Sequence, residues 1–193
     1  MAETPSTMLP LGSMMPGFSL NDAVTGSQVT DRDFEDHVGL LVMFICNHCP
    51  FVKHVVEELG RLGRDYSQRD VGIVAINSND VRSYPQDGPV HMKALAEQEG
   101  WGFPYLLDST QHVAREFRAA CTPDFYLFDG ERKLVYRGQL DDSRPGSGRP
   151  VTGRDLRAAL DAVLAGEAVS DSQAASLGCN IKWAPGNAPE YDD

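Results

Sequence analysis

A run of seven apolar, uncharged residues, GLLVMFI at positions 39 to 45, restricts the fold more than any other stretch of this chain. A strand with apolar side chains on both faces belongs in the middle of a sheet that is covered on both sides. From Pro50 onward the apolar residues instead recur at helical spacing, and this pattern ends near Gly63. The sequence therefore predicts a buried central strand that passes directly into an amphipathic helix.

The chain continues this alternation of strand and helix. Strands are predicted for VGIVAIN (71–77) and FPYLLD (103–108), and helices for 90–100 and 109–120. Two β-rich runs joined by Asp129-Gly130 then predict an antiparallel pair at the end of the sheet. The predicted fold class is therefore α/β, with a central mixed sheet flanked by helices.

The N-terminal part adds a smaller element. Apolar and polar residues alternate over 18–34, around a turn at Thr25-Gly26. This pattern predicts a short β-hairpin followed by a helical turn near residues 31–35.

The C-terminal part is predicted to be one helix and a tail. Thr152 and Asp155 have the spacing of a capping box, for a helix over 153–165. A chain of 193 residues with 41% hydrophobic content suits one domain, which we expect over 1–167. The tail, 168–193, has little periodicity. We expect it to be packed on the domain through Ile181 and Trp183.

Composition narrows the possible partners and the compartment. With 17 Lys and Arg against 28 Asp and Glu, the net charge is −11, so neither nucleic acid nor a membrane surface is an expected partner. No stretch has the pattern of a signal peptide or a membrane span, which favours a cytoplasmic protein. Four cysteines are too few for a secreted disulfide scaffold. In a reducing compartment, a close pair of thiols is more typical of catalysis or metal binding.

Such a close pair lies where the central strand meets its helix, in the motif CNHCP. A helix N-terminus favours a thiolate, and a thiolate is the form that attacks disulfides. We predict that Cys46 attacks a substrate disulfide and that Cys49 resolves the mixed disulfide. His48, directly before Cys49, is a candidate to stabilise the Cys46 thiolate.

The residues around the two cysteines distinguish between other possible functions of such a pair. Haem attachment requires histidine after the second cysteine, and Pro50 stands there. A structural zinc site requires a second ligand pair, which the isolated Cys121 and Cys179 do not supply. A copper(I) or zinc carrier stays open as an alternative. Its ligands would be Cys46, Cys49 and either His48 or His54.

Five separated blocks occur in the order PGFSL, FICNHCPFVKH, AINSNDVRSYPQDGP, CTPDFYLFDGERKLVYRGQLDD and SLGCNIKW. With these blocks the chain resembles the peroxiredoxin-like, AhpC/TSA and redoxin type of protein in the thioredoxin-like superfamily. The resemblance implies a thioredoxin-like fold with an N-terminal β-hairpin extension and a C-terminal tail. It also implies that Pro123 is a cis-proline beside the CxxC motif, and that Thr122 offers backbone hydrogen bonds to an extended substrate.

The predicted activity is thiol-disulfide exchange without a bound cofactor. The substrate would be a protein or small-molecule disulfide, and electrons would come from an external thiol reductant such as thioredoxin. A monomer and a homodimer are both compatible with the sequence.

A weak peroxidase activity is the alternative that the resemblance suggests. Peroxiredoxins place Pro seven residues and Thr or Ser three residues before the peroxidatic cysteine. Before Cys49 these places hold Val42 and Cys46, so the arrangement that activates peroxide is missing. Arg137, at the end of a predicted strand, is a possible source of positive charge for the site.

Two further thiols and three polar residues remain as auxiliary candidates. Cys121 is expected to pack in the core, although its position near Pro123 allows exchange with the pair. Cys179 could act as a resolving thiol only if the tail folds back over the edge of the sheet. The remaining three are Asn77, Asn79 and Asp80, for which hydrogen bonds within turns are the expected role.

Overall fold

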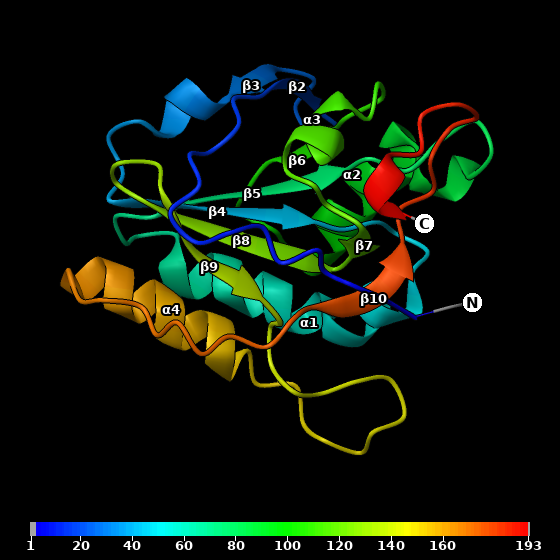
Figure 1. Cartoon of the computed structure of the whole chain (residues 1–193). Coiled ribbons are helices and arrows are strands. Elements are labelled where there is room, and N and C mark those ends of the chain that lie inside the picture. Colours follow the sequence, from blue (N-terminus) through cyan, green and yellow to red (C-terminus); the bar gives the residue numbers. More distant parts are fainter. Residues whose placement is uncertain (1–2, 193) are drawn as a thin grey trace.

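A computed structural model describes residues 3–192 of the chain. Its main sheet has seven strands in the order β3-β2-β6-β5-β4-β8-β9 (Figure 1). These strands are β2 (Ser19–Asp22), β3 (Gln28–Thr30), β4 (Gly39–Phe44), β5 (Gly72–Asn77), β6 (Tyr105–Leu107), β8 (Asp124–Asp129) and β9 (Leu134–Gly138). The pair β2 and β3 is the predicted N-terminal hairpin.

Strand β4 lies inside the sheet, as its apolar sequence predicts. It pairs in parallel with β5 on one side and antiparallel with β8 on the other, and all six of its residues are buried. Strand β5 pairs in parallel with β6, and β8 pairs antiparallel with β9. The predicted mixed α/β sheet is therefore confirmed.

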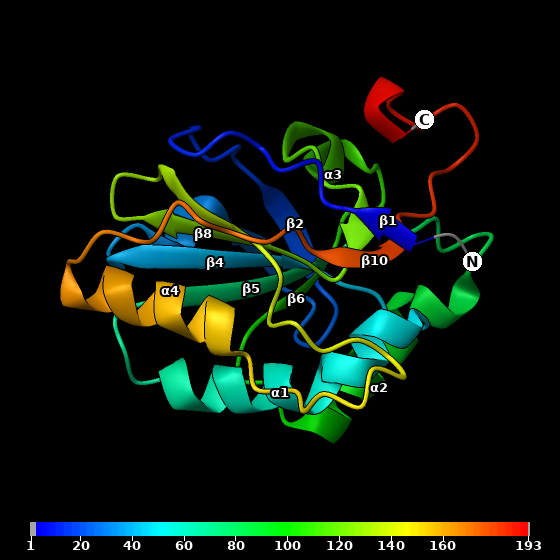
Figure 2. The same cartoon turned by 60° about the horizontal axis from the view of Figure 1, so that its bottom comes forward.

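Helices cover both faces of this sheet. They are α1 (Pro50–Tyr66), α2 (Pro89–Glu99), α3 (His112–Glu116) and α4 (Arg154–Ala165), together with the short 3-10 helices η1 (Asp31–Phe34), η2 (Pro85–Asp87) and η3 (Glu190–Asp192). Figure 2 shows α1, α2 and α4 on one face and α3 on the other. Side chains of β4 alternate accordingly: Met43 belongs to the core cluster of α1, α2 and α4, and Phe44 to the cluster that includes Phe117. No helix among residues 3–192 combines the length and the apolar composition needed to cross a bilayer.

Two helices differ in length from their predicted bounds. Helix α1 continues one turn beyond Gly63, because Tyr66 is buried against the core. Helix α3 is much shorter than 109–120, since Gln111 and Arg118 have positive φ values of 62° and 52° and interrupt the helical conformation on either side.

The predicted capping box of α4 is wrong. Gly153, with φ of +65°, is the N-cap residue, and no side chain of its own caps the helix. The carboxylate of Asp141 instead accepts hydrogen bonds from the backbone N–H groups of Thr152 and Gly153, at 2.6 and 2.7 Å. In the first turn of α4, the backbone N–H groups of Asp155 and Leu156 donate to the carbonyl oxygen of Leu140, each at 3.2 Å, so a backbone carbonyl takes the role that local spacing assigned to Thr152.

A second, three-stranded sheet includes part of the C-terminal segment, which the sequence does not predict. Its order is β1 (Glu3–Pro5), β10 (Leu177–Asn180) and β7 (Cys121–Thr122), and all pairs are antiparallel. Ile181 is buried and Trp183 packs against the same cluster, which is the anchoring role predicted for both. Strand β10 therefore lies beside the segment that precedes Pro123 (Figure 1).

One buried carboxylate of this region gives a prediction for stability. Asp124 accepts hydrogen bonds from Ser6 Oγ and Tyr126 Oη at 3.1 and 2.8 Å, but burial raises its pKa from 3.8 to about 6. Between about pH 4 and 6 the folded protein therefore binds more protons than the unfolded chain, and its stability falls as pH rises. A shift of about 2 units corresponds to roughly 3 kcal/mol.

We expect Asp124→Asn to remove this pH dependence, because an amide cannot ionise. Urea unfolding at pH 4 and pH 7 should show that the free energy of unfolding of the wild type, relative to Asp124→Asn, falls by up to about 3 kcal/mol between the two pH values. The exposed Asp171→Asn provides the control and should keep the slope of the wild type. Parallel pH profiles for wild type and Asp124→Asn would contradict the assignment.

Candidate active site

The two cysteines of CNHCP lie at the carboxyl end of the central strand. Strand β4 ends at Phe44 and α1 begins at Pro50, so Cys46 lies in the connection and Cys49 is the N-cap residue of the helix. Both side chains are enclosed, since Cys46 is 1% exposed and Cys49 is 0% exposed. The site is therefore formed but covered in this conformation.

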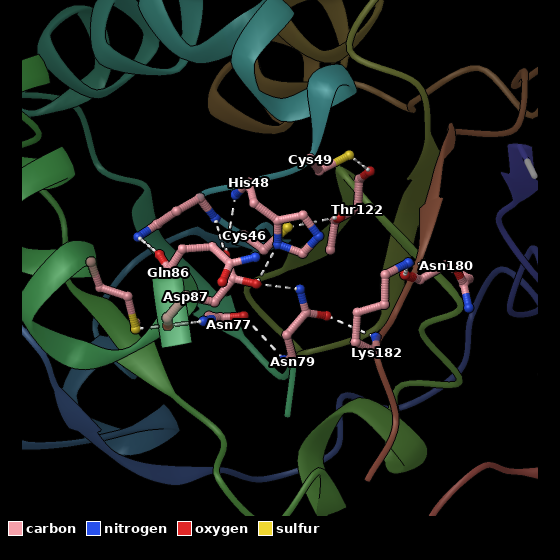
Figure 3. Close-up of polar contacts among 12 residues, drawn as sticks. Cys46, His48, Cys49, Asn77, Asn79, Gln86, Asp87, Thr122, Asn180 and Lys182 are labelled. Carbon is pink, nitrogen blue, oxygen red and sulfur yellow. Dashed lines mark hydrogen bonds and ion pairs between the residues drawn. The ribbon is translucent and has the colours of Figure 1, made fainter. Parts of the chain in front are cut away.

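Thr122 contacts the sulfur atoms of both Cys46 and Cys49. Its Oγ1 lies 3.4 Å from the Sγ of Cys46, and its carbonyl oxygen accepts a hydrogen bond of 3.1 Å from the Sγ of Cys49 (Figure 3). The peptide bond between Thr122 and Pro123 is cis, which confirms the prediction. The structure thus brings together the four residues that the sequence placed at the centre of the site.

Asp87, in the short helix η2, organises the loop that carries the cysteines, and the sequence did not predict this role. It is fully buried. One carboxylate oxygen accepts the backbone N–H groups of Asn47 and His48, at 2.9 and 3.1 Å. The other lies 2.5 Å from the Nδ1 of His48 and accepts the side-chain amide of Asn79 at 2.9 Å. A single carboxylate therefore fixes both the backbone and the histidine of the motif (Figure 3).

His48 is held between an aromatic ring and this carboxylate. Its ring stacks on Tyr84, with centroids 5.3 Å apart and planes inclined by 7°. One ligand atom from each of Cys46, His48 and Asp87 lies within 4.8 Å of the others, so these three residues could hold a metal ion. His54 has a different partner, because its Nε2 lies 3.1 Å from the Oγ of Ser143.

The polar residues after β5 form turn and loop hydrogen bonds, as predicted. Asn77 donates its side-chain amide to the carbonyl oxygen of Asp87 at 2.7 Å, and the carboxylate of Asp80 accepts the Oγ of Ser83 at 2.7 Å. Asn79 in addition accepts the backbone N–H of Lys182 at 2.8 Å. These bonds connect the loop of Asp87 to the C-terminal segment.

The favoured position of the thiolate differs from the prediction. The hydrogen bond that Cys46 gives to Cys49, burial, and the nearby charge of Asp87 all raise the pKa of Cys46. The pKa of Cys49 is lowered to about 4, chiefly because the thiol of Cys46 donates to it. Burial opposes this shift, but the thiol and the backbone N–H of Cys179 add to it. The negative charge is therefore expected on Cys49, with Cys46 protonated beside it.

A thiolate titration tests this assignment. We expect the absorbance of the reduced protein at 240 nm to show one ionisation near pH 4, lost in Cys49→Ser and shifted to higher pH in Cys46→Ala, where the donor is missing. Cys121→Ala serves as the control and should keep the wild-type curve. If the step near pH 4 persists in Cys49→Ser, the thiolate belongs to Cys46.

The three auxiliary candidates, Cys179, Cys121 and Arg137, differ in whether they adjoin the pair of Cys46 and Cys49. Cys179 in β10 is directly opposite Thr122, so the C-terminal segment does fold back onto the site. Cys121 is fully buried, and its sulfur lies 3.8 Å from the carbonyl oxygen of Pro123. The guanidinium of Arg137 donates to Gln173 at 2.8 Å, and among the hydrogen bonds of residues 3–192 none joins it to the cysteines.

Comparison with known proteins identifies the family. The model of the AhpC/TSA family matches residues 11–137. No curated protein matches the chain.

Among solved structures, an uncharacterized conserved protein from Geobacillus kaustophilus is 55% identical, with 96% of this chain and 98% of that chain covered and a TM-score of 0.94. A hypothetical protein from Sinorhizobium meliloti 1021 is 49% identical, with 95% and 100% covered and a TM-score of 0.93.

A more distant likeness concerns the fold alone. The thioredoxin domain of a thiol-disulfide oxidoreductase from Bacteroides vulgatus is 20% identical, covers 67% of this chain and 88% of its own, and has a TM-score of 0.56. The predicted thioredoxin-like fold is thereby confirmed. Since the family model spans more than half of the sequence, the chain belongs to the AhpC/TSA family.

Proposed function

We propose that this protein is a thiol-disulfide oxidoreductase in which Cys46 and Cys49 alternate between dithiol and disulfide. The observation that carries the proposal is the convergence of both sulfurs on Thr122, beside a cis-proline and at the carboxyl end of the central strand. Membership of a redoxin-type family supports an oxidoreductase activity. No cofactor takes part, because thiols supply both electrons.

The exchange proceeds in two steps. Cys46 attacks one sulfur of the substrate disulfide, its proton passes to the Cys49 thiolate, and the second substrate sulfur leaves as a thiolate that takes a proton from water. Cys49 then attacks the Cys46 sulfur of the mixed disulfide, and its proton passes to the first substrate sulfur, which leaves as a thiol. The products are a reduced substrate and a Cys46–Cys49 disulfide. An external dithiol such as thioredoxin restores the reduced protein.

The placement of the thiolate fits this order of events. A Cys49 thiolate next to the protonated Cys46 can act as the base that accepts the proton when Cys46 attacks. Cys46 lies in the connection before the helix and Cys49 is the N-cap residue, and the two side chains are 1% and 0% exposed. Since both are covered, substrate entry requires a covering segment to move.

The test compares three reactions of the purified, reduced protein. Reduction of a disulfide substrate such as insulin should be observed at pH 7 and should require Cys46. Hydrogen peroxide consumption is measured in parallel, since rapid turnover of peroxide with slow disulfide reduction would favour a peroxidase over an oxidoreductase. Failure of both reactions in a folded, fully reduced protein would overturn the proposal.

A zinc-binding protein is the second candidate, because Cys46, His48 and Asp87 each present a ligand atom within 4.8 Å of the others. Sulfur, nitrogen and carboxylate oxygen are all zinc ligands. Such an ion would have to replace the hydrogen bond between His48 and Asp87. Calorimetric titration with zinc, in the wild type and in His48→Ala, decides between the two candidates: tight binding that is lost in the variant, without disulfide exchange, would favour the metal site.

A further inference from the structure

A third thiol lies at the same point as the CxxC pair. Strands β7 and β10 are antiparallel, and in their register Cys179 is directly opposite Thr122. Thr122 is also the residue whose hydroxyl contacts the sulfur of Cys46 and whose carbonyl accepts from Cys49. One residue of β7 therefore has three cysteines around it.

The strand geometry directs Cys179 toward the pair. Residues that are directly opposite in an antiparallel ladder point their side chains to the same face, with Cβ atoms about 4.5–5.5 Å apart. The side chain of Thr122 faces Cys46, so the side chain of Cys179 faces the same way. Cys121 is the next residue along β7 and points to the opposite face, away from the pair.

The backbone of β10 is fitted closely against β7 at this point. A Cβ atom at Gly178 would lie 2.0 Å from the carbonyl oxygen of Thr122 and 3.1 Å from the nitrogen of Pro123, so only glycine allows this approach. Cys179 is 2% exposed and belongs to the same core cluster as Cys46 and Cys49. The position of the third thiol is therefore fixed by packing rather than by a mobile tail.

Cys49 lies between the other two thiols. The thiols of Cys46 and Cys179 both donate toward its sulfur, and both interactions lower the pKa of Cys49. Burial, followed by the bond to Cys49, raises the pKa of Cys179 to about 12, and the pKa of Cys46 is raised as well. The proton that Cys179 gives up can pass to a departing Cys46 thiolate, because both sulfurs adjoin Cys49 in the same enclosed cluster.

We propose that Cys179 is a third redox-active thiol, which takes over the disulfide of the CxxC pair by attacking the sulfur of Cys49. The Cys46–Cys49 bond breaks, a Cys49–Cys179 bond forms, and the proton of Cys179 passes to Cys46. One disulfide replaces another, so the step requires no added oxidant or reductant. It rests on the proposed function, since that function supplies the Cys46–Cys49 disulfide.

The exchange has two consequences for the site. Cys46, the thiol that meets the substrate, is regenerated while the protein is still oxidised. The new disulfide also ties β10 to the start of α1, over the backbone of Thr122.

The first experiment isolates the proposed bond. Cys46→Ser protein is reduced, treated with one equivalent of diamide and digested with trypsin without reductant. Cleavage after Arg32, Lys53, Arg157 and Lys182 separates the peptides 33–53 and 158–182, which carry Cys49 and Cys179. Mass spectrometry should find these two peptides joined. The joined product should be absent from Cys46→Ser/Cys179→Ser and retained in Cys46→Ser/Cys121→Ala.

The second experiment tests the transfer in the wild type. After oxidation with one equivalent of a disulfide substrate, iodoacetamide should label Cys46 in a fraction of the molecules, and this label should disappear in Cys179→Ala, whose fold is checked by circular dichroism. The proposal is overturned if the free thiol besides Cys121 is always Cys179, or if Cys46→Ser forms no link to Cys179. Either result leaves the proposed function intact, because that function fails only if the wild type exchanges no disulfide.

Discussion

Replacement of Cys46 with serine is expected to lower the rate of disulfide reduction by at least about 1000-fold, because the hydroxyl that remains is not a nucleophile toward disulfides. Serine differs from cysteine by a single atom of smaller radius, so the fold should be preserved. Cys49 keeps its own thiolate, but in the proposed order of events it acts on the mixed disulfide and does not attack the substrate. The measurement is the reduction of insulin at pH 7 with a constant supply of external dithiol.

Cys49→Ser is expected to block the second step of the exchange, the resolution of the mixed disulfide. Cys46 still attacks, but no neighbouring thiolate resolves the product, so a mixed disulfide between Cys46 and the substrate accumulates. Incubation with an aromatic disulfide, followed by intact-mass analysis, should show one adduct on Cys49→Ser and none on Cys46→Ser. Cys121→Ala, on the opposite face of β7, is the matched control and should behave like the wild type. Equal adducts on both CxxC variants would contradict the assignment of Cys46 as the attacking thiol, and an adduct on Cys46→Ser alone would reverse it.

Asp87→Ala is expected to lower the free energy of unfolding by about 3–5 kcal/mol, because four donors in and around the CxxC loop lose a buried acceptor. These donors are the backbone N–H groups of Asn47 and His48, the ring of His48 and the amide of Asn79. Urea unfolding of the reduced protein measures the loss. Asp80→Ala, at a half-buried position whose carboxylate accepts from Arg82 and Ser83 of its own turn, should cost less than about 1 kcal/mol.

The charge of Asp87 has an effect separate from stability. Asp87→Asn keeps an acceptor oxygen but removes the negative charge that raises the pKa of Cys46. In a Cys49→Ser background, the rate of alkylation of Cys46 by iodoacetamide should therefore rise at lower pH than it does with Asp87 present. If Asp87→Asn leaves the pH profile of Cys46 alkylation unchanged and Asp87→Ala is as stable as the wild type, Asp87 has no role in the site.

Local patterns account for the parts of the fold that the sequence predicts. The apolar run at 39–45 and the helical spacing after Pro50 are short-range signals, and β4 and α1 confirm both. The failures occur where an interaction comes from elsewhere in the chain: the carbonyl of Leu140 accepts the first N–H groups of α4 in place of Thr152, and strand β10 forms because β1 and β7 pair with it. Propensity cannot supply such partners, since a strand of four residues is stable only within a sheet.

For the site, the sequence by itself determined the CxxC pair at the end of a buried strand and the place of Thr122 and Pro123 in the order of elements. Only the tertiary structure decided which groups surround the sulfurs. Asp87 is 40 residues from Asn47 and yet holds its backbone. Cys179 reaches Thr122 through a strand that no periodicity indicates. The position of the thiolate depends on these neighbours, because a pKa is set by the charges and donors that folding brings within a few ångströms.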